Sequence, residues 1–103
     1  MLIRSQDKKV LCQLSNIEIV ERYKRTKDGE KVTTGYAVYI FGERDTEIFM
    51  AEYSTAEKAV KVLDMIEDAY NKCFAFTMGN DGYYHEVRES KVFQMPQDEE
   101  VEV

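Results

Sequence analysis

STAEKAVKVLDMIEDAYNKC, residues 54–73, is the stretch of sequence that decides the fold. It opens with Ser54 and has Glu57 three positions later, which is the pattern of a capping box at a helix start. Behind this start, apolar residues recur at spacings of three and four: Ala59, Val62, Leu63, Ile66, Ala69, Tyr70 and Cys73. The positions between them are mostly charged. The pattern predicts one amphipathic helix over about residues 54–73 that buries a single apolar stripe.

Four short runs of β-branched and aromatic residues precede this helix, at residues 10–14, 17–23, 36–41 and 47–53. The pair Asp28-Gly29 supplies the positive φ of a hairpin turn, and residues 42–45 form a second short connection. Short connections join antiparallel neighbours, so the runs predict a meander. The central strands are apolar on both faces, so part of the second face is expected to be covered. Residues 74–78 and 91–95 are further candidate strands, whereas residues 83–90 carry no clear pattern.

The elements together predict an α+β fold, in which one long helix packs across an antiparallel sheet of four to six strands. Residues 1–96 are expected to form a single domain. Residues 97–103 (QDEEVEV) follow the only proline and are acidic, so we expect a flexible, solvated tail. A small sheet leaves edges and apolar surface uncovered, which favours a homo-oligomer.

The charge balance and the hydropathy pattern limit which partners and which cellular compartment can be expected for this chain. With 14 basic and 20 acidic residues the net charge is −6, which disfavours unspecific binding to nucleic acid or to anionic membranes. No apolar run approaches the ~18 residues of a membrane span, and no secretory signal precedes the first strand. We therefore expect a cytoplasmic protein, with Cys12 and Cys73 as free thiols.

Motifs for catalysis or cofactor binding are not found. His85 is the only histidine, so H-E-x-x-H cannot occur. Residues 79–82 resemble part of a calcium loop, but its first and last ligand positions would fall on Thr77 and Arg88. Neither a P-loop nor G-x-G-x-x-G is present. We expect a protein that is not an enzyme and that carries no metal and no cofactor.

Several polar and aromatic residues stand where a helix-on-sheet core would not need them. Aromatic rings that stack on a base, together with guanidinium contacts to phosphate, are an economical way to hold a nucleotide. The candidate ligand-binding residues are Arg4, Ser5, Gln6, Tyr83, Tyr84, His85, Arg88 and Gln94. The alternative is that the segment from Arg4 to Lys8 forms a capped turn and that the tyrosines line the rim of the core.

Three segments carry a resemblance to a known group of proteins. They are Ile3-Arg4-Ser5-Gln6-Asp7-Lys8, the helix start Glu52-Tyr53-Ser54-Thr55 with the following Ala59-Val60-Lys61-Val62-Leu63-Asp64-Met65-Ile66, and Val92-Phe93-Gln94-Met95-Pro96. In these segments the chain resembles small uncharacterised proteins of Gram-positive bacteria and their phages. The resemblance implies an accessory gene of a phage or other mobile element, acting in a bacterial host, and it implies no functional residues.

Two functional hypotheses follow. The first is a non-catalytic binding protein that sequesters a small nucleotide-like immune signal, as an anti-defence sponge would. The alternative is an inhibitor or adaptor that binds a host protein through its acidic surface and has no small-molecule pocket.

Overall fold

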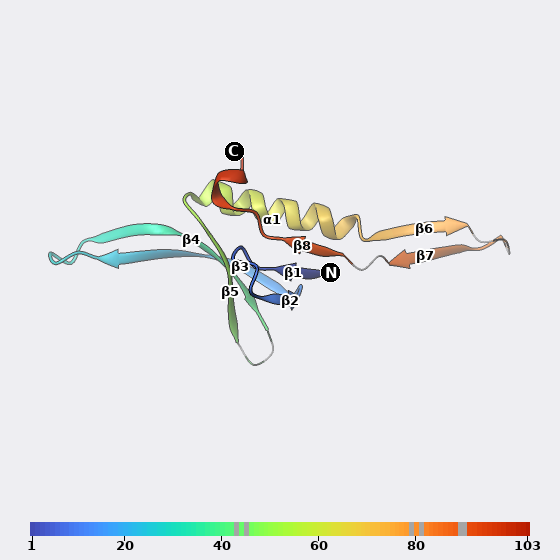
Figure 1. Cartoon of the computed structure of the whole chain (residues 1–103), viewed down its shortest axis with the longest axis horizontal. Coiled ribbons are helices and arrows are strands. Elements are labelled where there is room, and N and C mark those ends of the chain that lie inside the picture. Colours follow the sequence, from blue (N-terminus) through green and yellow to red (C-terminus); the bar gives the residue numbers. More distant parts are fainter. Residues whose placement is uncertain (43, 45, 79, 81, 89–90) are drawn as a thin grey trace.

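The computed structural model describes the chain except for residues 43, 45, 79, 81, 89 and 90, and for residues 74–78 and 84–88 it describes the backbone alone. The fold is α+β, as predicted (Figure 1). The elements in chain order are β1 (Leu2–Arg4), β2 (Leu11–Gln13), β3 (Asn16–Arg25), β4 (Lys31–Phe41), β5 (Glu47–Tyr53), α1 (Ala56–Asn71), β6 (Phe74–Met78), β7 (Tyr84–Arg88), β8 (Val92–Gln94) and the short 3₁₀ helix η2 (Asp98–Glu100).

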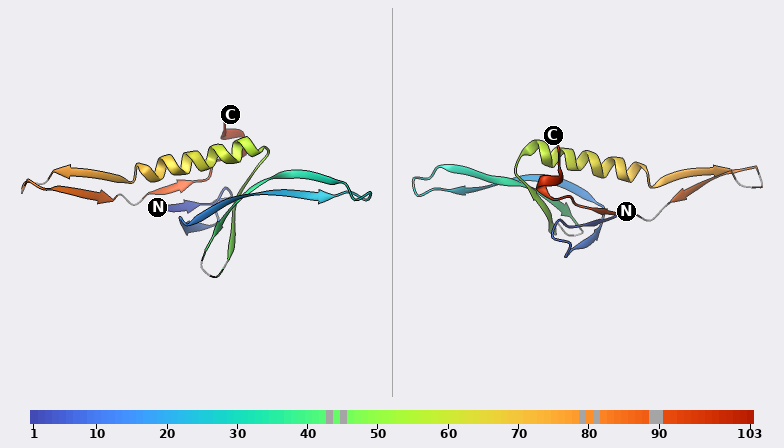
Figure 2. Two further views of the ribbon diagram at one scale, coloured as in Figure 1. Left: turned by 180° about the vertical axis from the view of Figure 1, so that it is seen from behind. Right: turned by 45° about the horizontal axis from the view of Figure 1, so that its top comes forward.

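The molecule is elongated, with extents of 72 × 34 × 19 Å and a radius of gyration of 17.6 Å. A compact chain of this length would have a radius of gyration of roughly 13 Å. Two antiparallel ribbons account for the difference, because the distal part of β3–β4 and the β6–β7 hairpin project in opposite directions from the core (Figures 1 and 2).

The strands form three sheets in place of the single antiparallel sheet that we predicted. Their orders are β2-β1-β8, β3-β4-β5 and β6-β7. The meander β3-β4-β5 is confirmed, and Gly29 has the expected positive φ of 81° at its first turn. In contrast, β1 pairs in parallel with β8, and Ile3 lies opposite Phe93. No local sequence signal reports a pairing between strands 90 residues apart, which is why the prediction missed it.

Helix α1 packs against β4 and β5 and begins one residue later than expected. Thr55 is the N-cap, and its hydroxyl accepts from the Lys58 amide at 3.2 Å. The predicted cap Ser54 instead binds Asp98: its amide and its hydroxyl both donate to Asp98 Oδ1, at 2.8 and 3.0 Å. The cap was therefore assigned to the wrong residue, because a tertiary contact occupies the serine.

The apolar stripe of α1 is confirmed at its centre and corrected at its edge. Ala59, Val62 and Ile66 are buried, whereas Leu63 is half-buried and Tyr70 is exposed. The core that they enter draws on all parts of the chain. It contains Ile3, Val38, Ile40, Met50, Ala51, Tyr53, Ala59, Val62, Ile66, Met95 and Val101.

The C-terminal segment is part of this core, so our prediction of a solvated tail from residue 97 was wrong. Val101 is 4% exposed and belongs to the core cluster. Lys58 Nζ donates to the Asp98 carbonyl at 2.9 Å, and Gln97 Nε2 donates to the Gln6 carbonyl at 2.7 Å. The acidic composition suggested solvation, but Gln97 and Asp98 are hydrogen-bonded to other parts of the chain.

Candidate ligand-binding site

The first group of predicted site residues lies in a turn between β1 and β2. Ser5 is buried; its hydroxyl donates to Asp7 Oδ1 at 2.6 Å and accepts from the Val10 amide at 3.0 Å. The hydrogen bond from Ser5 is the main cause that lowers the pKa of the Asp7 carboxyl. Lys8 has a φ of 67°, in the left-handed region. This is the capped turn of our alternative interpretation, so Ser5 is a structural residue.

Gln6 joins three segments of the chain. Its Nε2 donates to the carbonyls of Glu52 at 3.2 Å and Pro96 at 3.1 Å, and its Oε1 accepts from the Glu52 amide at 3.0 Å. The side-chain amide thus pairs with both backbone groups of Glu52, as a residue of a neighbouring strand would. Both polar atoms of this side chain have partners within the chain, which favours a structural role for Gln6 over the predicted ligand-binding role.

Gln94 is exposed, and its amide nitrogen is bound within the chain. Its Nε2 donates to the Ser5 carbonyl and to the Met95 carbonyl, both at 2.9 Å. Beside it, the Tyr53 hydroxyl donates to the Pro96 carbonyl at 2.8 Å, and burial raises the pKa of this phenol. Ser5, Gln6 and Gln94 therefore do come together, but as the hydrogen-bonded junction between β1, β5 and β8.

The second group lies elsewhere. Tyr83 is 71% exposed and directly precedes β7, the second strand of the β6–β7 ribbon. Tyr84, His85 and Arg88 are β7 residues paired with Met78, Thr77 and Phe74, and their side chains lie outside the described part.

Arg4, exposed on β1, belongs to the core sheet, so the structure does not bring it together with Tyr83. Three surface hollows of about 370, 500 and 330 Å³ are lined by residues other than the eight candidates.

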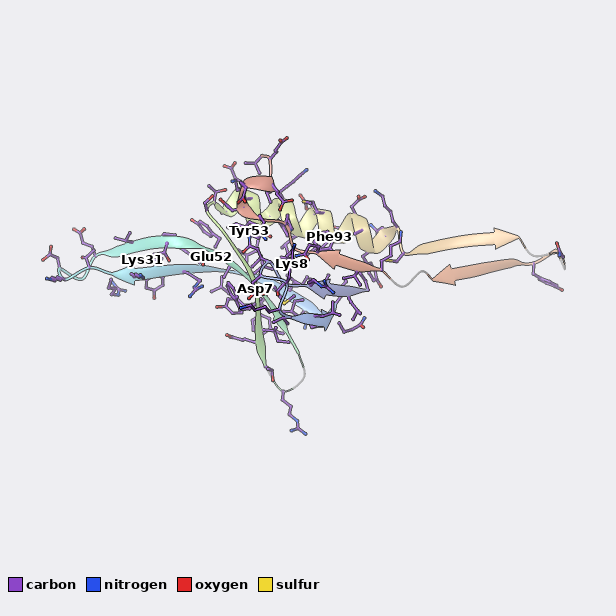
Figure 3. All side chains as sticks on the ribbon, viewed as in Figure 1. Asp7, Lys8, Lys31, Glu52, Tyr53 and Phe93 are labelled. Carbon is purple, nitrogen blue, oxygen red and sulfur yellow. The ribbon has the colours of Figure 1, made fainter. Side chains whose placement is uncertain are left out.

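A cluster that the sequence analysis did not identify lies on the distal β3–β4 ribbon. Lys31 Nζ is 4.7 Å and Arg25 Cζ 5.8 Å from the centre of the Tyr23 ring, which is 49% exposed. Lys31 also pairs with Glu21 at 3.3 Å, and the Thr33 hydroxyl donates to the same carboxylate. These five residues are called the ribbon cluster below. Figure 3 shows Lys31 on the projecting ribbon and Tyr53 at the core.

The ribbon cluster follows from strand alternation and pairing. Tyr23 and Arg25 lie two residues apart on β3, and the register places Thr33 and Lys31 opposite them on β4. The signal was present in the sequence, because these positions flank the Asp28-Gly29 turn almost symmetrically. The predicted strand ended at residue 23, so the pairing beyond it was missed.

The chemistry of the ribbon cluster is that of an anion-binding surface with an aromatic platform. Arg25 uses one of its five N–H groups, on Nη1, to donate to the Gly29 carbonyl at 3.0 Å. The hydrogen bond from Thr33, followed by that from Lys31, lowers the pKa of Glu21. The two cations lie over one half-exposed ring, where both can contact a phosphate.

The chain matches no protein-family model, no curated protein and no solved structure. Within the described residues, no helix is long and apolar enough to cross a membrane. Among the same residues, no three His, Cys, Asp or Glu side chains are grouped to hold a metal ion.

Proposed function

We propose that this protein is a non-catalytic binding protein that holds a small nucleotide-like anion on the ribbon cluster. The observation that carries the proposal is the position of two cations, Arg25 and Lys31, within 6 Å of the half-exposed Tyr23 ring. The phosphates of the ligand would accept from the guanidinium and the ammonium groups, and its base would replace one of these cations over the Tyr23 ring. Retention without turnover would lower the free concentration of the ligand, so the protein would act as a sponge for a nucleotide-like signal.

Charge distribution supports the same assignment. The protein as a whole is acidic, with a net charge of −6. Against this background the distal ribbon carries five basic residues, Arg22, Lys24, Arg25, Lys27 and Lys31, and three acids, Glu21, Asp28 and Glu30. The ribbon is therefore a local cationic surface that attracts anions, while the rest of the molecule repels them.

The alternative function, an adaptor or inhibitor that docks through an acidic surface, has less support. Asp98 is bound to Ser54 and Lys58, and Glu100 Oε1 accepts from the Gln97 amide at 3.1 Å. Two acids of the C-terminal segment are thus used inside the chain. We retain the adaptor as the function favoured if no nucleotide binds.

A thermal-shift series with cyclic dinucleotides and ADP-ribose derivatives tests the proposal. A ligand at one hundred times its dissociation constant adds about 2.7 kcal/mol of stability, which corresponds to a rise of roughly 10 °C or more for a domain of this size. The double variant Arg25→Gln/Lys31→Gln should bind at least 10-fold more weakly by calorimetry.

The matched control is Lys24→Gln/Lys27→Gln, which removes the same charge from the same ribbon but leaves the ribbon cluster intact. It should bind within about 3-fold of the wild type. Loss of binding in Tyr83→Ala, with the ribbon-cluster variant unaffected, would move the site to the β6–β7 ribbon. No shift with any nucleotide would contradict the proposal.

A further inference from the structure

One face of the β3-β4-β5 sheet carries the partly exposed apolar side chains of Val20 and Phe49. Helix α1 packs on the face formed by Ile19, Val38 and Ile40, which belong to or contact the core. The opposite face presents Val20, Ala37, Tyr39 and Phe49, as the register requires, since Val20 pairs with Ala37 and Tyr39 with Phe49. We call these four residues the outer face. None of them belongs to the core cluster.

The outer face has a packed apolar centre and a charged rim. The rings of Tyr39 and Phe49 meet edge to face with their centres 5.7 Å apart, and Ala37 is fully buried beneath its neighbours. Arg22 covers part of the Phe49 ring at 5.5 Å and pairs with Glu52 at 3.2 Å. Val20 and Phe49 nevertheless remain 39% and 42% exposed. An apolar centre inside a polar rim is the usual composition of a protein–protein interface.

The total surface of the chain indicates how much of it a partner could cover. The accessible surface is 7540 Å², whereas a compact protein of this mass exposes roughly 6,000 Å². The surplus of about 1,500 Å² exceeds the ~800 Å² that each partner buries in an interface of standard size. The two projecting ribbons contribute to this surplus, so it is an upper bound on the surface that a partner could cover at the outer face.

We propose that the outer face is the interface of a homodimer, in which two β3-β4-β5 sheets pack face to face about a twofold axis near Val20. The charges support a second copy as the occupant. Glu18, Val20 and Arg22 follow one another at every second position of β3, so they share the outer side of the strand. A twofold axis near Val20 places Glu18 of each copy opposite Arg22 of the other. The face is therefore complementary to itself, as an isologous contact requires.

This interface and the ribbon cluster use opposite sides of β3. Side chains alternate along β3, so Tyr23 and Arg25 lie on the side opposite to Val20 and Arg22. The irregularity in register with β4 falls between Arg22 and Tyr23. Dimerisation through the outer face therefore leaves the ribbon cluster open, and the two proposals can fail independently.

Sedimentation equilibrium without ligand, at protein concentrations from 1 to 100 µM or about that range, tests the dimer. The wild type should approach about 24 kDa, twice the chain mass of 12.1 kDa. Phe49→Glu and Val20→Glu should each weaken association at least 100-fold with unchanged circular dichroism, because each places a carboxylate in the apolar centre. The matched control Val60→Glu, at a half-exposed valine on α1, should associate as the wild type does.

A charge-exchange experiment separates an interface from a merely structural role. Glu18→Arg and Arg22→Glu should each weaken self-association, since each variant puts like charges opposite one another. An equimolar mixture of the two variants should recover a dimer close to wild-type affinity, because all facing pairs are again of opposite charge. A monomeric wild type at 100 µM or so, a dimer unaffected by Phe49→Glu, or no recovery in the mixture would each overturn the proposal.

Discussion

Replacing Gln6 with alanine tests the structural role that the fold gives to this residue. The change removes three side-chain hydrogen bonds, two to the Glu52 backbone and one to the Pro96 carbonyl. The Pro96 carbonyl still accepts the hydrogen bond from the Tyr53 hydroxyl, so losing the bond from Gln6 to this carbonyl costs little stability. The Glu52 amide and carbonyl lose their side-chain partner at the edge of β5. Each unpaired, half-buried group costs about 1–3 kcal/mol, partly offset by water, so we expect a loss of ~2–3 kcal/mol.

Urea denaturation followed by far-ultraviolet circular dichroism measures this loss. With a slope near 1–1.5 kcal/mol/M, typical of a small domain, the midpoint should fall by roughly 2 M. The matched control is Gln13→Ala, which removes one exposed bond to the Met1 carbonyl at 3.3 Å. This control should stay within ~0.5 kcal/mol of the wild type.

The same pair of variants decides between a structural and a ligand-binding Gln6. If Gln6→Ala is as stable as Gln13→Ala, the reasoning from the hydrogen bonds is refuted. If Gln6→Ala keeps its stability but abolishes a nucleotide-induced thermal shift, our original interpretation of Gln6 as a ligand contact would be restored.

Three further predictions concern the core and the C-terminal segment. Ile66→Ala should cost ~2–5 kcal/mol in urea denaturation and Lys61→Ala no more than ~0.5, because only Ile66 is buried; equal losses would contradict the orientation of α1. Val101→Ala should cost ~1–3 kcal/mol and speed proteolysis of the C-terminal segment, whereas a solvated tail would show neither effect. The hydrogen bond from the Ser54 amide is the main cause that lowers the pKa of Asp98 below 3.8, so this carboxylate stabilises the fold above that pH and loses its contribution as pH falls through the lower folded value. Between about pH 6 and 2.5 the melting temperature of the wild type should therefore fall further than that of Asp98→Asn, and parallel curves would show that the bond is unimportant.

The parts of the fold that were predictable are those whose signals are local. Helix α1 and the meander were recovered because a repeat of three and four residues, alternating strands and an Asp-Gly turn each act over a few neighbours. The parallel pairing of β1 with β8 and the anchoring of Val101 depend on residues far apart in sequence. Composition alone pointed the wrong way for the acidic C-terminal segment, since it does not report that Asp98 has partners on α1.

The candidate site was predicted less well than the fold. Ser5, Gln6 and Gln94 were singled out because a core does not usually need polar residues, but here they satisfy backbone groups where the sheets meet. That role could not be inferred without knowing which carbonyls lack a strand partner. The contact between Lys31 and the Tyr23 ring required only a longer hairpin, so a strand pattern extended to the turn would have found it.

The pairing of β1 with β8 has a consequence for synthesis of the chain on the ribosome. The β3–β4 hairpin closes a loop of five residues and can form as soon as it emerges, whereas Ile3 has to wait for Phe93. Closing a loop of about 90 residues costs roughly 2.5 kcal/mol more in chain entropy than closing one of five. Ile3 therefore lacks its β8 neighbour until Phe93 has been made, although β2 can already pair with β1 at that stage.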